Sequence, residues 1–314
     1  MYSHSLKYFL FIGASLLCSC SGSIKSKYDD TPTSGNVPIV VDESYQPLVD
    51  VELDTFMKLY KYATVRPDYL PESEVINRLL HDDSVRIAIL SRDLNESEKS
   101  YMTSQKIVPR VTKVAVDAVA FFVNQQNPDS QLTYSELAAI IRGDKKTWKE
   151  LSNKASTEPI QVVFDKSGSS NTRFLKERFL GNRSFPANCF AAGSNQDVVD
   201  YVRNTPGAIG VVGVNWISDR QDENVERFLS TVKVVQLSAQ EDSTGNEYYS
   251  PLQAYIALKK YPLTRDVLII SREGRNGLGT GFASFFAGDQ GQRLVRLTGM
   301  LPANMPIRII KISE

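Results

Sequence analysis

The chain carries the run TKVAVDAVAFFV at Thr112–Val123, in which Lys113 and Asp117 are the charged residues. A strand in a globular protein is usually about 5–6 residues long, and β-branched and aromatic residues favour the extended conformation. This run therefore predicts an extended segment that is long enough to cross from one domain to another. The length of 314 residues agrees with two domains of about 150 residues each.

Strands and helices alternate on the N-terminal side of this run. Short apolar stretches predict strands at Asn36–Asp42, Thr64–Tyr69 and Val85–Leu90. Helices are predicted after the first strand, from Pro71 onward, and at Leu94–Lys106. The order βαβαβα calls for an α/β sheet with helices on both faces.

The same alternation continues on the C-terminal side. Leu132–Arg142 predicts an amphipathic helix with a capping box of Thr133 and Glu136, and Gly143 ends it. Further helices are predicted at Arg173–Leu180, Asn195–Arg203, Gly281–Phe286 and Gln290–Leu297. Further strands are predicted at Gln161–Phe164, Gly207–Val214, Lys233–Leu237, Ala254–Leu258 and Ile307–Ile312.

The composition excludes several classes of function. There are 36 Lys+Arg and 36 Asp+Glu residues, so the chain lacks the basic surplus of a nucleic-acid-binding protein. Two histidines and three cysteines are too few for a multi-histidine or Cys/His metal site, or for a disulfide framework. We therefore expect no metal, no cofactor and no nucleic-acid partner.

The first residues predict a targeting segment. An apolar run of about ten residues from Tyr8 to Leu17 is too short for a membrane-spanning helix, which takes ~20 residues, and is typical of a signal peptide. The sequence Leu17-Cys18-Ser19-Cys20 is similar to the lipobox of bacterial lipoproteins. We expect residues 1–19 to be the signal peptide and Cys20 to carry a membrane anchor of lipid. An uncleaved anchor helix or an ordinary secretory signal is the alternative.

Residues 20–35 predict a flexible tether. Their sequence from Ser21 to Gly35 is polar, contains Ser, Gly, Pro and charged residues, and lacks periodicity. An N-terminal extension that packs on the folded domain is the alternative.

Three turns between a predicted strand and a predicted helix carry hydroxyl side chains. They are Asp42–Tyr45, Leu90–Arg92 and Asp165–Arg173. The free N–H groups of a helix N-terminus bind oxyanions, and small hydroxyl residues add donors. In an open α/β sheet such turns meet at the carboxyl ends of the strands. The sequence therefore predicts one oxyanion site built from these turns.

Catalytic motifs are poorly matched. Ser230–Lys233 fits the SxxK pattern of penicillin-binding enzymes and Lys166–Gly168 resembles their KTG, but the two occur in the wrong order. A serine hydrolase would need a base, and only His81 or a lysine is available; His81 lies at a predicted helix end, where the dipole favours it. We therefore expect no catalytic residue and no enzyme, with a serine hydrolase as a further alternative.

Four segments, in order along the chain, resemble the phosphate-type periplasmic binding proteins that serve ABC importers. They are Leu132–Trp148, the loop Asp165–Ser169, Thr205–Gly210, and Gly288–Gln292 together with Gly299–Pro302. The resemblance covers most of residues 36–314.

The resemblance implies an α/β protein of the two-lobed type II periplasmic-binding-protein fold, with a ligand cleft between lobes that two crossover strands join. Lobe I would comprise residues 36–118 and 219–314, and lobe II residues 119–218. The cleft would hold inorganic phosphate or a related oxyanion, which a monomer in the bacterial cell envelope delivers to an ABC importer permease. The implied anion-binding residues are Ser44, Tyr45, Ser91, Arg92, Ser167, Gly168 and Ser169.

Two departures from the family pattern leave alternatives open. Arg92 stands where the phosphate prototype has an aspartate that accepts the phosphate proton, and Val163 stands where it has an arginine. Arg173 is a second residue that could replace this charge. The loop could also bind the anion one residue further on, through Ser170 and Thr172. The alternative function is a sensor or an envelope-complex interaction module of the same fold with a degenerate anion site.

Overall fold

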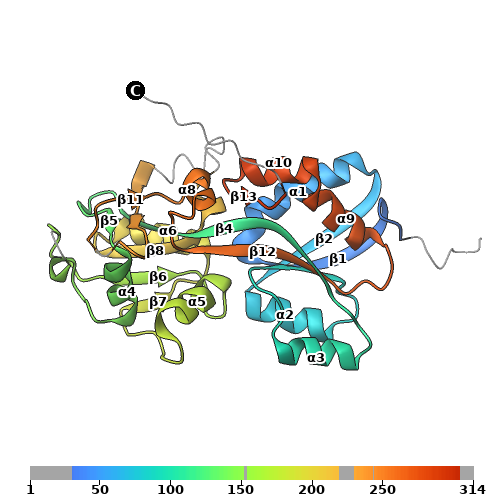
Figure 1. The fold of residues 1–314 in the computed structure, drawn as a ribbon, viewed down its shortest axis with the longest axis horizontal. Coiled ribbons are helices and arrows are strands. Elements are labelled where there is room, and N and C mark those ends of the chain that lie inside the picture. Colours follow the sequence, from blue (N-terminus) through green and yellow to red (C-terminus); the bar gives the residue numbers. More distant parts are fainter. Residues whose placement is uncertain (1–29, 152–153, 219–229, 243, 305–314) are drawn as a thin grey trace, which may run out of the picture.

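The computed structural model describes residues 30–151, 154–218, 230–242 and 244–304. They form two α/β lobes that lie side by side and are joined by two long antiparallel strands, β4 (Arg110–Asn124) and β12 (Thr264–Ser271) (Figure 1). The segment Thr112–Val123 lies within β4, so the predicted crossing strand and the two-lobed α/β fold are confirmed.

The sheet of the first lobe has the strand order β2-β1-β3-β12-β4. β1 (Ser34–Asp42) is parallel to β2 (Tyr62–Leu70) and to β3 (Ile87–Leu90), whereas β12 is antiparallel to β3 and β4. Parallel neighbours need crossover connections, and here α1 (Gln46–Leu59) and α2 (Glu72–His81) supply them. α3 (Glu96–Ser104) leads from β3 into β4.

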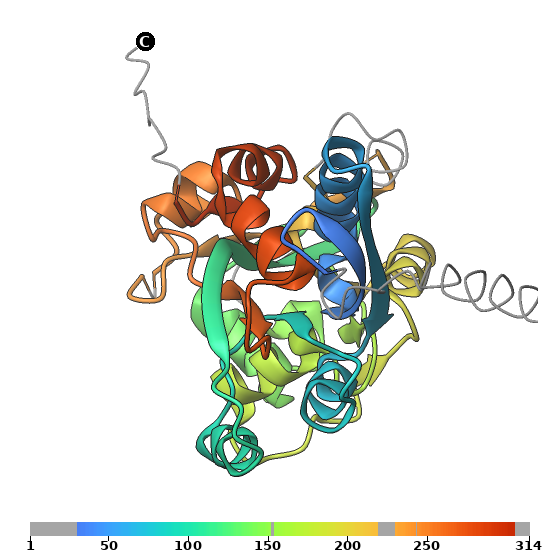
Figure 2. The same ribbon diagram turned by 90° about the vertical axis from the view of Figure 1, so that its right-hand side faces the viewer.

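Alternate strand residues of this sheet face two separate helical layers. Ile39 and Val41 belong to the apolar cluster that includes Phe56 of α1 and Phe282 of α9 (Leu278–Ala287). Val40, between them, belongs to a second cluster with residues of α2 and α3. Because side chains alternate along a strand, the apolar run of β1 is buried on both faces. Figure 2 shows α9 and α1 on one side of the strands and α2 and α3 on the other, with α10 (Asp289–Leu297) next to α9.

The sheet of the second lobe continues from β4 through β8 (Ala208–Gly213) and β6 (Gln161–Phe164) to β7 (Cys189–Ala191). Its described helices are α4 (Tyr134–Arg142), α5 (Ser170–Leu175) and α6 (Asn195–Asn204). β9 (Val232–Val234) pairs with the end of β4. β10 (Gln236–Ser238) pairs with β5 (Gln131–Leu132) and β11 (Tyr248–Tyr249) in a small separate sheet.

Local signals in the sequence located several element ends correctly. Thr133 and Glu136 form both hydrogen bonds of the predicted capping box at the start of α4. Gly143 ends that helix with φ +77°, a conformation that only glycine adopts without strain. The predicted strand Gln161–Phe164 coincides with β6.

Two parts of the fold differ from the sequence predictions, and a third prediction is not tested. Gln253–Ala257 forms the short helix α8, where we expected a strand at Ala254–Leu258, because so short an apolar run fits either periodicity. β12 was not predicted, although the run Val267–Ile270 is the signal for it. The predicted strand Ile307–Ile312 lies outside the described residues.

The expected lobe boundaries also change. We expected the chain to return to lobe I at residue 219, but β9 pairs with the second-lobe end of β4 and β10 with β5, and β12 is the strand that re-enters the first lobe. The end of the expected tether is fixed to the first lobe through Asp30. The Asp30 carboxylate accepts a hydrogen bond from the N–H of Leu278 and forms ion pairs with Arg86 and Arg275. Residues 30–35 are therefore packed on the first lobe. Among the helices in the described ranges, none combines the length and the hydropathy needed to cross a membrane.

The close packing of Gly210 predicts a sensitive position in β8. A Cβ atom there would lie 2.3 Å from Cζ of Phe122, a fully buried ring on β4. Gly210→Ala is expected to lower the free energy of unfolding by about 1–3 kcal/mol, because the core must repack. Gly274→Ala is the matched control, since no atom lies within 4 Å of its added Cβ. Chemical denaturation measures both, and equal stability of the two variants would contradict this packing argument.

Candidate functional site

The predicted turns meet at the interface of the two lobes. The turn after β1 and the turn after β3 belong to the first lobe, and the loop between β6 and α5 approaches them from the second. The carboxyl ends of parallel strands are the usual ligand site of open α/β sheets. Contacts across the interface include Lys166 Nζ to Glu43 Oε2 at 2.6 Å and the Ser73 N–H donating to the Gly168 carbonyl at 3.2 Å.

The inner cluster consists of Asp42, Ser44, Asp117, Ser170 and Arg265. Ser44 Oγ of the first lobe lies 3.1 Å from Ser170 Oγ of the second. Arg265 Nη1 donates to Ser170 Oγ at 3.0 Å. All five residues are buried, so the cluster places two hydroxyl groups and one guanidinium at a point that both lobes enclose.

Arg265 is held in place by Asp117. The two residues face each other in the register of the two crossing strands, β12 and β4. Arg265 Nε donates to Asp117 Oδ2 at 2.9 Å, and the second oxygen of Asp117 accepts from the Val214 N–H at 3.1 Å. The guanidinium also lies 5.4 Å from the centroid of the buried Tyr45 ring, a cation–π distance.

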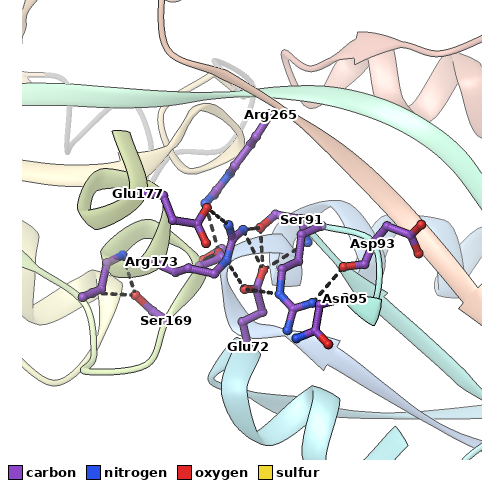
Figure 3. Close-up of polar contacts among 12 residues, drawn as sticks. Glu72, Ser91, Asp93, Asn95, Ser169, Arg173, Glu177 and Arg265 are labelled. Carbon is purple, nitrogen blue, oxygen red and sulfur yellow. Dashed lines mark hydrogen bonds and ion pairs between the residues drawn. The ribbon is translucent and has the colours of Figure 1, made fainter. Parts of the chain in front are cut away.

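The outer cluster consists of Glu72, Ser91, Arg92 and Arg173. Glu72, the first residue of α2, accepts from Ser91 Oγ at 2.5 Å and from the Ser91 N–H at 3.3 Å. Arg173 of α5 donates to both Glu72 oxygens and, at 2.7 Å, to Ser91 Oγ. Figure 3 shows Glu72 enclosed by Ser91 and Arg173, with Arg265 approaching from the crossing strands.

The loop after β6 uses most of its own polar groups internally. Asp165 accepts from Ser169 Oγ at 2.5 Å and from Asn171 Nδ2 at 3.1 Å, and Ser169 caps α5. Thr172 Oγ1 donates to the Lys166 carbonyl at 2.9 Å. These bonds stabilise the loop, and they leave Ser170 as the loop hydroxyl that meets the other lobe.

The structure brings some of the predicted site residues together and not others. Ser44, Ser91, Ser170 and Arg173 converge at the lobe interface. Ser167 and Gly168 are exposed, and Gly168 has φ +87°, so its role is to turn the loop. The register one residue further on is therefore the one whose hydroxyl faces the cleft.

Four more of the predicted residues have structural partners. Tyr45 is fully buried beneath Arg265. Arg92 donates to both oxygens of Glu98, at 2.8 and 2.7 Å, and its Nε lies 3.9 Å from Glu72. Ser169 and Thr172 are engaged within the loop. The positive charge at the lobe interface therefore comes mainly from the guanidinium groups of Arg265 and Arg173.

Sequence reasoning missed Arg265, Asp117 and Glu72. Asp117 interrupts the apolar run of β4 and Arg265 precedes that of β12; an isolated charge in a buried strand is the signal that could have paired them. Glu72 was placed at a helix start, where an acidic residue is ordinary, so nothing local marked it as part of the site.

The carboxylates of the site differ in protonation. Burial and the nearby Glu72 carboxylate raise the pKa of Asp42 to about 7, although Arg265, Ser170 and the Ser44 N–H act in the opposite direction. Burial also acts to raise the pKa of Glu72, but hydrogen bonds and charge from Arg173 and the Ser91 hydroxyl hold it below its usual value. Near neutral pH the Glu72 side chain is thus ionised, while the Asp42 side chain is partly protonated.

Comparisons with known proteins found relatives that match most of the chain. A family model described as the PBP superfamily domain matches residues 26–290. The phosphate-binding protein PstS of Staphylococcus epidermidis is 24% identical over 286 residues, which are 90% of this chain and 83% of the relative. PstS of Pseudomonas aeruginosa is 23% identical over 296 residues, covering 90% and 87%.

Solved structures show the same fold. A Clostridium perfringens protein described as a phosphate ABC transporter substrate-binding protein with bound phosphate has a TM-score of 0.70 at 21% identity, over 86% of this chain and all (100%) of the other. An ABC-type phosphate transport receptor from Vibrio cholerae has a TM-score of 0.62 at 21% identity, with coverage of 86% and 100%.

The raised pKa of Asp42 predicts a pH dependence of stability. The folded protein holds this proton up to about pH 7, whereas an unfolded aspartate loses it near about pH 4. Unfolding releases the proton in this window, so the free energy of unfolding falls as pH rises, by at most ~1.4 kcal/mol per pH unit. Asp42→Asn lacks this proton and is expected to gain stability relative to the native chain between pH 4 and 7. Denaturant titrations across this range measure the difference, and parallel profiles would contradict it.

Proposed function

The chain belongs to the PBP superfamily, and we propose that it captures an inorganic oxyanion, phosphate, between its two lobes for uptake by an ABC importer. The observation that carries this proposal is the inner cluster, in which Ser44 and Ser170 hydroxyls from opposite lobes meet the Arg265 guanidinium. An anion at this point draws donors from both lobes and from a crossing strand, so its binding favours the closed form.

The chemistry of the cluster suits phosphate. Hydrogen bonds from neutral or charged donors to a charged oxygen contribute about 1.5–3 kcal/mol each, and an arginine matches a phosphate edge with two parallel N–H groups. Asp42, whose pKa is raised to about 7, is mostly ionised above that pH and can then accept a hydrogen bond from hydrogen phosphate. The relatives that cover most of the chain are phosphate-binding proteins by name, which supports the same ligand.

The remaining parts of the proposal concern placement. Residues 1–19 would be removed as a signal peptide and Cys20 lipidated, which would anchor the chain at the bacterial cell envelope as a monomer that serves a permease. These residues lie outside the described ranges. We expect no catalysis, because His81 donates to or accepts from the Tyr101 hydroxyl at 3.0 Å at the far end of α2, away from the cluster hydroxyls.

One observation favours the alternative of a sensor or an envelope-complex interaction module. Glu72 already uses the hydroxyl of Ser91 and the guanidinium of Arg173, which are donors that an anion would need. A protein with this site could have lost the anion and kept the fold.

Calorimetric titration separates the two functions. The full chain, purified from membranes in detergent and stripped of ligand by unfolding and refolding, is titrated with phosphate and then with sulfate at pH 6 and pH 8. The proposal expects micromolar or tighter phosphate binding, which corresponds to about −8 kcal/mol or below, and weaker sulfate binding at pH 8, where the ionised Asp42 carboxylate finds no proton on sulfate to accept. Heat from neither anion would overturn the uptake function and support the alternative.

The loop register provides a second test. Ser170→Ala is expected to weaken phosphate binding at least tenfold, since its hydroxyl contacts both Ser44 and Arg265. Ser167→Ala, three residues earlier in the same loop and exposed, is the matched control and should bind within twofold of the native chain. A loss confined to Ser167→Ala would return the site to the register expected from the family resemblance.

A further inference from the structure

Glu72 is an anion of the protein itself, placed among the donors of the cleft. Its side chain is 2% exposed. It stands at the first position of α2, where the helix dipole favours negative charge. Four donor contacts converge on its two oxygens: the Ser91 hydroxyl, the Ser91 N–H, and Nε and Nη2 of Arg173.

These donors come from both lobes. Ser91 follows β3 in the first lobe, and Arg173 lies in α5 of the second. Arg173 also bonds Ser91 Oγ directly at 2.7 Å. The three side chains therefore form a bridge across the cleft that needs no external ligand.

We propose that Glu72 is a tethered competitor: its carboxylate occupies the Ser91–Arg173 half of the cleft in the anion-free protein, holds the lobes together, and lowers the affinity for a free oxyanion. The effect on affinity rests on the proposed function, because it supposes that an oxyanion enters this cleft. The bridge itself does not depend on that supposition.

The competition follows from charge and connectivity. A tethered group acts at an effective concentration in the millimolar range or above, so a free anion must displace it to reach Ser91 and Arg173. Besides these residues, the charged groups that act on Glu72 are Arg92, Arg265 and Asp42. A phosphate beside Glu72 and Asp42 would meet two carboxylates, so its entry is opposed until one of them leaves or is protonated.

The chain offers a matched control in Glu177. Its carboxylate also binds Arg173, through Nη1 at 2.6 Å, but it is 62% exposed and takes no part in the hydrogen bonds between Glu72 and Ser91. Glu177→Gln thus removes one negative charge from the same arginine and leaves the bridge intact.

The first measurement is phosphate affinity of the full chain. Glu72→Gln is expected to bind phosphate at least tenfold more tightly than the native chain, because a neutral amide competes poorly for Arg173. Glu177→Gln should stay within twofold. Unchanged or weaker binding by Glu72→Gln, with the native chain binding normally, would overturn the competition.

The second measurement uses no phosphate and tests the bridge alone. The Ser73 N–H donates across the cleft to the Gly168 carbonyl at 3.2 Å, whereas the next two N–H groups, of Glu74 and Val75, bond to Pro71 within the same helix start. In hydrogen exchange of the anion-free chain, Glu72→Gln should speed exchange at Ser73 at least threefold and leave Glu74 and Val75 unchanged. Ser91→Ala should act in the same direction, and it serves if Glu72→Gln does not fold.

The two measurements separate the proposals. Unchanged exchange at Ser73 in both variants would overturn the bridge, whatever the affinity. Faster exchange at Ser73 together with no phosphate binding by any variant would support the bridge and overturn the proposed function.

Discussion

The buried ion pair between Arg265 and Asp117 is the interaction on which the rest of the site depends. Side-chain exposures of 2% and 0% place two charges where desolvation costs several kcal/mol per ion. Removing one partner would leave the other uncompensated, so the two crossing strands must keep their register opposite each other at this point. The same register directs Nη1 of Arg265 to the Ser170 hydroxyl. The crossing strand β12 is thereby hydrogen-bonded to the start of α5 in the second lobe.

The cleft contains charged side chains of both signs before any ligand enters it. Its carboxylates are those of Asp42, Glu43, Glu72, Asp117 and Asp165, and its cations are Arg92, Lys166, Arg173 and Arg265. Most of them already have partners within the protein. A strongly charged oxyanion can therefore enter only by exchanging partners, and the protonation state of Asp42 and the position of Glu72 decide how much that exchange costs. Selectivity in such a site comes from rearranged bonds more than from an excess of positive charge.

The lobes themselves follow from simple patterning. The apolar runs of β1 and β3 are buried on both faces, and short helices with polar outer surfaces cover the sheet. One free cysteine, Cys189, is buried among the described residues, so packing and not disulfide bonds holds this part of the chain. Gly210, pressed against Phe122, shows how tightly the second sheet packs on the crossing strand.

The sequence by itself determined the alternation of strands and helices, the crossing strand at Thr112–Val123, the capping box of α4 and the three hydroxyl-bearing turns. These depend on periodicity, capping and turn chemistry, which act over a few residues. The tertiary structure alone decided that Ser170 and not Ser167 faces the other lobe, that Arg265 joins Asp117, and that Glu72 takes the donors of Ser91 and Arg173. The partners in the last two cases are separated by 148 and 101 residues along the chain, and no local pattern records which distant side chains the packing of two lobes will bring together.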